Sequence, residues 1–305
     1  MRMILKTALG GALVLAALAG CGGDEGGSKP AAQVVATTPQ VADMARAVAG
    51  RRAEVTQILR PGVDAHDFEP RPSDARAVAE GDVLVASGGE LDDWVNEISS
   101  TAGFKGKILT VFDEIQPVSQ DDPHWWQDPR NGVRAVGEIE RLLIATDPKG
   151  RATYERNARF YIQRLRRMDR SIAACMAKVP RAQRKLVTTH DAFGYYARRY
   201  DIEEVGALIP SLSTQAQPSG RDIQRLVDQI RAERVKAIFP ETALNPRLER
   251  AVSREAGVRV APGLWADTLG PPNSPAGTYL GSLASNTATL VDGMSGGRVR
   301  CRPAA

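Results

Sequence analysis

Residues 148–176 read PKGRATYERNARFYIQRLRRMDRSIAACM, and this stretch decides the architecture that we expect. After Gly150 it contains neither glycine nor proline. Its apolar side chains recur at alternating steps of four and three residues, which places them on one stripe of an α-helix. They are Tyr154, Ala158, Tyr161, Leu165, Met168, Ile172 and Cys175. The segment predicts one helix of about 40 Å, which is long enough to pack on two separate lobes.

Short apolar strands alternate with amphipathic helices on both sides of this helix. We expect strands at 33–38, 53–59, 82–87, 107–111, 185–189, 202–208, 235–239 and 258–264. Such alternation is typical of parallel sheets covered by helices. We therefore predict an α/β fold of two lobes, each a mainly parallel four-stranded sheet flanked by helices, joined by one long rigid backbone helix. The expected parts are an N-terminal lobe over 33–147, a linker helix over 148–180 and a C-terminal lobe over 181–305.

The N-terminus resembles the export signal of a bacterial lipoprotein. Two cations in residues 1–6 precede an uncharged run that is too short to remain as a membrane-spanning helix. The run ends in Leu18-Ala19-Gly20-Cys21, which is similar to a lipoprotein cleavage box. The resemblance predicts a signal peptide over 1–20, a lipid on Cys21, a flexible tether over 21–32 and a protein anchored outside the bacterial cytoplasm. Ordinary secretion with a chance cysteine is the alternative.

Charge and cysteine content narrow the function further. The formal charge of +4 falls to +2 without Arg2 and Lys6 of the leader, and this near-neutral balance argues against a nucleic-acid partner. If Cys21 carries lipid, Cys175 and Cys301 remain as an even pair in an oxidising compartment. They form either a disulfide between the C-terminus and the long helix or two free thiols.

The chain has only three histidines, and each follows a predicted strand. His66, His124 and His190 share this position with Asp267, which follows the last strand of the second lobe. Ligands of open parallel sheets bind beyond the carboxyl ends of the strands, so two facing lobes would bring all four side chains into one cleft. Three imidazoles and one carboxylate suit tetrahedral Zn²⁺, and four protein ligands leave no open position for an activated water. This favours binding over catalysis.

Five short motifs surround the candidate residues: Pro61-Gly-Val-Asp-Ala-His66-Asp-Phe-Glu-Pro, Asp122-Pro-His124-Trp-Trp-Gln-Asp-Pro129, Thr189-His190-Asp-Ala-Phe, Ile238-Phe-Pro-Glu241 and Asp267-Thr-Leu-Gly. Together they resemble the zinc- or manganese-binding solute-binding proteins of ABC transporters (cluster A-I). The match spans about residues 33 to 294 in the family's order. The resemblance implies a metal held between two lobes, with His66 and His124 from the first and His190 and Asp267 from the second. It also implies a membrane permease as partner, and we expect a monomer.

The third ligand bears on the metal. In the family, a histidine at the position of His190 usually accompanies zinc, and glutamate usually accompanies manganese. The loop before His124 lacks the histidine-rich segment of many zinc members, which leaves manganese or a mixed specificity open. Asp67, Asp128, Asp191 and Glu241 are candidates to orient the imidazoles, with Glu241 a possible alternative ligand. Each could equally be a helix cap or a surface acid. Three tryptophans could wall the cleft or simply pack in the core: Trp125, Trp126 and Trp265.

Two rival functions remain at this point. A zinc hydrolase would need an open metal position and a general base, and the sequence contains none of the common zinc-protease, serine-hydrolase or P-loop motifs. A surface adhesin with a structural metal is the other rival, although no separate adhesive module is evident.

Overall fold

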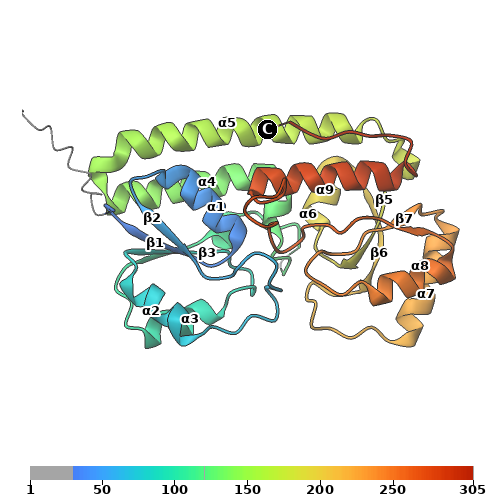
Figure 1. Cartoon of the computed structure of the whole chain (residues 1–305), viewed down its shortest axis with the longest axis horizontal. Helices are drawn as coiled ribbons and strands as arrows, with labels where there is room; N and C mark the ends of the chain where they lie inside the picture. Colours follow the sequence, from blue (N-terminus) through green and yellow to red (C-terminus); the bar gives the residue numbers. More distant parts are fainter. Residues whose placement is uncertain (1–29, 120, 305) are drawn as a thin grey trace, which may run out of the picture.

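The long helix is α5 (Arg151–Met176), and it lies across both halves of the molecule (Figure 1). The computed structural model describes residues 30–119 and 121–304. The predicted signal peptide, Cys21 and nearly all of the tether therefore lie outside the described residues. The buried positions of α5 are the predicted stripe from Tyr154 to Cys175, together with Met176.

The N-terminal half is built on a parallel four-stranded sheet with the order β2-β1-β3-β4. Its strands are β1 (Gln33–Ala36), β2 (Glu54–Gln57), β3 (Val83–Ala86) and β4 (Lys107–Thr110). Figure 1 shows α1 (Pro39–Ala49) between this sheet and α5, and α2 (Pro72–Glu80) and α3 (Trp94–Thr101) on the far side. The Thr38 hydroxyl caps α1, and Gly50 ends it with a φ of 59°.

Helix α4 (Pro129–Thr146) is an element that the sequence analysis missed. It packs beside α5 and α1 and begins where the Asp128 carboxylate accepts the Arg130 amide. Its buried residues are Pro129, Gly132, Ala135, Val136, Ile139 and Leu143. Two glycines and several charged residues dilute this narrow stripe, so the periodicity is weak in the sequence. Four short 3₁₀ helices were missed as well: η1 (Val111–Glu114), η2 (Trp125–Gln127), η3 (Pro148–Gly150) and η4 (Arg181–Gln183).

The C-terminal half also pairs its strands in parallel, but its hydrogen-bond ladder is interrupted. β5 (Lys185–His190) pairs with β6 (Glu203–Ile209), and β7 (Ala237–Ile238) pairs with β8 (Arg259–Val260). Within the described parts of the chain, a single bridge between Thr188 and Phe239 joins the two pairs. Pro240 and Pro262 follow the short strands closely and cannot donate to a ladder, which explains why β7 and β8 end early.

Helices cover both sides of this half as well. They are α6 (Gly194–Tyr200), α7 (Gly220–Ala232), α8 (Arg247–Ala256) and α9 (Tyr279–Met294). Helices α6 and α9 contact α5, whereas α7 and α8 pack together on the far side (Figure 1). In the described chain, no helix is both long and apolar enough to span a membrane.

The apolar core does not divide at the boundary between the halves. One cluster runs from β1 through α4 and α5 to α9, and it includes Leu186 and Leu264 of the C-terminal half. A second, smaller cluster lies between β5, β6 and β7 and the outer helices α7 and α8, with Leu226, Val227 and Val252 among its members. The long helix is thus part of the larger core rather than a bare connection.

The segment after α9 returns along α5 and is fixed there (Figure 1). Cys301 forms a disulfide with Cys175 of α5, with a Cα–Cα distance of 5.5 Å. The backbone N–H of Ala304 donates to the Ser171 hydroxyl on the same helix. Of the two alternatives left by the sequence, the structure has the bonded pair.

Candidate metal centre

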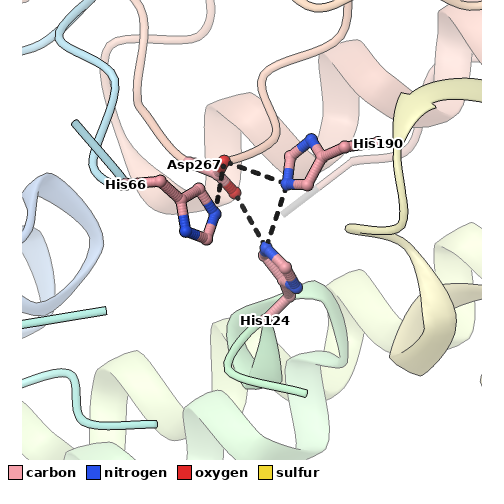
Figure 2. A group of neighbouring side chains, drawn as sticks. All are labelled: His66, His124, His190 and Asp267. Atoms are coloured by element: carbon pink, nitrogen blue, oxygen red, sulfur yellow. Dashed lines mark hydrogen bonds and ion pairs between the residues drawn. The ribbon is translucent and has the colours of Figure 1, made fainter. Parts of the chain in front are cut away.

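Four side chains from both halves point toward one another in Figure 2: His66, His124, His190 and Asp267. His66 lies in the loop between β2 and α2, and His124 immediately precedes η2. His190 is the last residue of β5. Asp267 follows Leu264, which forms a parallel bridge with Glu241. Each half contributes two side chains from the carboxyl ends of its strands, as the sequence predicts.

The spacing of the four groups matches a small ion with protein ligands. One ligand atom from each residue lies within 4.8 Å of the others. The Nε2 atoms of His124 and His190 are 3.2 Å apart. The Asp267 carboxylate lies 3.5 Å from His66 Nε2, 3.4 Å from His124 Nε2 and 3.3 Å from His190 Nε2. Ligands about 2.0–2.2 Å from a tetrahedral zinc ion lie about 3.3–3.6 Å from one another, so these separations need little adjustment.

Two carboxylates hold two of the rings from behind. His124 Nδ1–H donates to Asp122 Oδ1 over 2.8 Å, and His190 Nδ1–H donates to Glu241 Oε1 over 2.6 Å. The same carboxylates accept the backbone N–H groups of His124 and His190. A carboxylate on Nδ1 fixes the tautomer that leaves Nε2 free to bind a cation, and it increases the basicity of the ring. Both rings are therefore oriented before a cation arrives.

The buried charges at this centre are strongly coupled. Burial alone would lower the pKa of His190, but the carboxylates of Asp267 and Glu241 raise it to about 9. Burial would raise the pKa of Asp267, but the charges of His190 and His124 lower it. Without a cation, an imidazolium at His190 and the Asp267 carboxylate thus stabilise each other. A metal ion that binds to Nε2 must displace this proton.

Two buried polar atoms of the cluster have no hydrogen-bond partner among the described residues: His66 Nε2 and Asp267 Oδ1. Both side chains are largely buried, at 8% and 6% exposure. Unsatisfied buried polar atoms are uncommon in folded proteins and call for an ion, a water or a functional role. Here they belong to two of the four residues that point toward a common centre (Figure 2).

The predicted orienting acids differ in their positions. Of the four, only Glu241 contacts an imidazole, and it lies behind His190 rather than among the four converging groups. The Asp128 carboxylate caps α4 and binds the Arg130 side chain instead. Asp67 is exposed, and the backbone of Asp191 donates to the Ser211 carbonyl. Helix capping, one of the alternatives named for these acids, is what Asp128 does.

Asp122, which orients His124, was not among the candidates. It lies two residues before the histidine, and this spacing lets one carboxylate accept both the backbone and the ring N–H of His124. The sequence Asp122-Pro-His124 therefore carried the signal. Whether an acid two residues away turns toward the ring depends on the backbone path, which the sequence alone does not specify.

Hydrogen bonds across the two halves surround the centre. The Trp126 indole N–H donates to the Ala266 carbonyl over 2.8 Å, and the Gln127 amide donates to the same oxygen over 3.1 Å. The Trp126 ring also lies edge-on to His124, with 5.4 Å between ring centroids. The Gly62 amide donates to the Thr268 hydroxyl. The loops of His66, His124 and Asp267 are thus joined to one another around the site.

The other two tryptophans are less involved. Trp125 is buried, and its indole N–H points to Ser87, so it packs in the core. Trp265 is half-buried, and its backbone amide donates to Asn286 of α9. Trp126 is therefore the tryptophan that walls the centre.

Comparison with known proteins gives one family. The sequence model described as zinc-uptake complex component A, periplasmic, matches residues 34–293. The manganese-binding lipoprotein MntA of Bacillus subtilis is 31% identical over 290 residues, covering 90% of this chain and 94% of that protein. The protein of the same name from Halalkalibacterium halodurans is 30% identical over 284 residues, covering 91% of this chain and 94% of that protein.

A solved structure agrees with these sequence matches. The periplasmic zinc-binding protein TroA from Treponema pallidum superposes with a TM-score of 0.80. It is 26% identical in sequence, and the match covers 87% of this chain and 99% of that one. The two-lobed α/β fold expected from the sequence is therefore confirmed.

Proposed function

Since the chain belongs to the family of periplasmic zinc-uptake complex component A proteins, we propose that it captures a divalent metal ion outside the cytoplasm and delivers it to the permease of an ABC importer. The observation that carries this proposal is the convergence of His66, His124, His190 and Asp267 from both halves. Ligands shared between two halves let the ion couple their positions, which a permease could sense.

We propose Zn²⁺ as the preferred cargo. Three imidazole nitrogens and one carboxylate oxygen form a set that suits zinc, and the measured separations fit tetrahedral coordination. Manganese or a mixed specificity is the alternative, because two relatives at 30–31% identity are named manganese-binding lipoproteins. Mn²⁺ prefers more oxygen ligands and octahedral geometry, which would require the Asp267 carboxylate to chelate or water to join the site.

The donor set also supports binding over catalysis. Four protein ligands complete a tetrahedral shell, so no coordination position remains for a zinc-activated water. Glu241, an acid that a hydrolase could use as a general base, accepts the Nδ1–H of His190. A zinc hydrolase is therefore the weaker alternative. A metal-dependent adhesin ranks lower for a different reason, because no separate adhesive module is evident in the sequence.

We further propose that the protein is attached to the membrane through a lipid on Cys21 after cleavage of residues 1–20. The support is the box Leu18-Ala19-Gly20-Cys21 and the lipoprotein names of its relatives. Residues 33–147 and 181–305 would act as the two metal-binding lobes, with 148–180 as the linker. Membrane fractionation tests the anchor, because Cys21→Ala should shift the protein from the membrane to the soluble fraction.

Metal analysis tests the cargo. The purified protein is stripped with a chelator, offered equal concentrations of Zn²⁺ and Mn²⁺, dialysed and analysed by atomic emission. We expect about one zinc per chain and a sharp loss of zinc in His190→Ala. Stoichiometric manganese with zinc excluded would overturn the zinc assignment. Unchanged zinc binding in Asp267→Ala would remove that residue from the ligands and reopen the hydrolase alternative.

Delivery needs a separate test in the cell. Deleting the gene should slow growth in medium depleted of metal by a chelator, and added zinc should restore it. A strain that grows normally under depletion but loses surface attachment would favour the adhesin.

A further inference from the structure

A cavity of about 470 Å³ lies at the seam between the two halves, away from the four converging ligands. Its walls come from α4 of the N-terminal half, α6 of the C-terminal half and the loop after η1. Four arginines line it, Arg130 and Arg134 from α4 and Arg198 and Arg199 from α6, against a single lining carboxylate, that of Asp128. The cavity is therefore a concentration of positive charge.

Two of the four guanidinium groups already have carboxylate partners. Arg130 binds Asp128 with its Nε 2.9 Å from Oδ2, and Arg199 binds Asp169 of α5 through two hydrogen bonds of 2.8 and 2.9 Å. These pairs hold the two arginines in fixed orientations at the wall. A guanidinium held in this way keeps further N–H donors for a second acceptor.

The other two arginines have no such partner. Within the described residues, neither Arg134 nor Arg198 forms an ion pair or a side-chain hydrogen bond. Arg134 lies four residues after Arg130 on the same face of α4, and both Arg134 and Arg198 are exposed. The Asp128 carboxylate neutralises Arg130, so the positive charges without a carboxylate partner at this wall are those of Arg134 and Arg198. The hydrogen bond to Asp128 raises the pKa of Arg130, and the positive charge of Arg199 acts in the opposite direction. The guanidinium groups of Arg130 and Arg199 therefore influence each other electrostatically.

We propose that this cavity binds a small multivalent oxyanion, a phosphate or a polycarboxylate, between Arg134 of α4 and Arg198 of α6. Two uncompensated guanidinium groups match an anion with at least two negative charges, and planar guanidinium forks suit carboxylate and phosphate oxygens. The volume is within the usual range for small-molecule sites. Because α4 and α6 belong to different halves, the anion would connect the halves at a position separate from the metal.

Calorimetric titration of the purified, metal-free protein tests the site. Inorganic phosphate and citrate are titrated separately in a low-salt chloride buffer. We expect about one anion per chain, and we expect Arg134→Gln combined with Arg198→Gln to weaken binding at least about tenfold. Comparing the two anions distinguishes a phosphate from a polycarboxylate site. If neither binds to the wild-type protein, the proposal is wrong.

A matched control separates a specific site from general attraction. Arg247→Gln combined with Arg254→Gln removes two exposed charges on α8, a helix that contributes no residue to the lining of the cavity. This pair should leave anion binding unchanged. An equal loss in this control would overturn the proposal, because the attraction would then depend only on net charge. Zinc binding of every variant is measured in parallel and should be unchanged, since none of the replaced arginines contacts a proposed metal ligand. If the variant with both Arg134→Gln and Arg198→Gln does not fold, the variant with Arg134→Lys and Arg198→Lys is used instead. We then expect the lysine variant to bind the anion more weakly than the wild type. Unaltered binding by the lysine variant would overturn the proposal.

Discussion

Replacing Glu241 with glutamine should weaken zinc binding by an amount that depends on pH. The Glu241 carboxylate accepts the Nδ1–H of His190 over 2.6 Å, and both side chains are buried. Glutamine keeps an oxygen at this position but removes the negative charge that makes the ring more basic. Loss of such a partner typically costs about 10- to 100-fold in metal affinity, or about 1.4–2.7 kcal/mol.

Proton competition should hide part of this loss at lower pH. The pKa of His190 is raised to about 9, so at pH 7 only about 1% of the rings are neutral and ready to bind a metal. Glu241 is one of the two carboxylates that raise this pKa, and without it the pKa falls. The variant therefore loses affinity but also has a weaker competing proton. We expect the ratio of wild-type to variant affinity to be largest near pH 9 and to shrink toward pH 6.5.

The assay is competition for Zn²⁺ against a chromogenic chelator of known affinity, at pH 6.5, 7.5 and 9. Glu255→Gln, an exposed change on α8, is the matched control and should behave as the wild type. A ratio that is the same at all three pH values would refute the proton competition. Equal affinities of variant and wild type throughout would refute the role of Glu241 in preparing His190.

Three further changes test the contacts between the halves, the disulfide and the packing of α5. Trp126→Phe removes one of two donors to the Ala266 carbonyl, and we expect a loss of about 1 kcal/mol in stability and weaker zinc binding, measured by thermal unfolding with and without zinc. An unchanged melting temperature would contradict a stabilising hydrogen bond from Trp126 to the other half. Cys175→Ala with Cys301→Ala removes a cross-link between residues 126 positions apart, and the chain-entropy model gives a loss of about 5 kcal/mol at most in the free energy of unfolding. Urea unfolding of the reduced wild type should match that of the variant. Leu165→Ala in the buried stripe of α5 should cost about 2–5 kcal/mol in the same assay, while Gln163→Ala on the exposed face should cost little.

The sequence carried the parts of the fold that repeat along the chain. The stripe from Tyr154 to Cys175 has one period over the whole helix, so its length and buried face could be predicted. Helix α4 was missed because Gly132, Gly137 and several charged residues weaken its apolar period. Helix capping was one of the alternatives for Asp128, and a carboxylate followed by proline is a common start of a helix. The structure has this arrangement.

The candidate metal centre could be predicted because the end of a strand determines where the next residues lie relative to the sheet. His66, His124, His190 and Asp267 follow strands, and parallel pairing brings such positions to one edge. The partners of the rings were less accessible, because Asp122 and Glu241 reach them only through the particular turns of their loops. The early ends of β7 and β8 follow from Pro240 and Pro262, whose positions near the ends of the predicted strands were visible in the sequence but were not used.

The larger core includes α5 and parts of both halves, and its extent should determine which parts of the protein unfold together. A cooperative unit of folding is defined by continuous packing rather than by the outline of a lobe. The N-terminal half, α5, α9 and the inner side of the C-terminal half should therefore melt together, whereas the small cluster under α7 and α8 could open on its own. His190 and Asp267 are flanked by Ala192 and Ala266 of the larger cluster. Fluctuations of the outer helices would thus leave His190 and Asp267 in place.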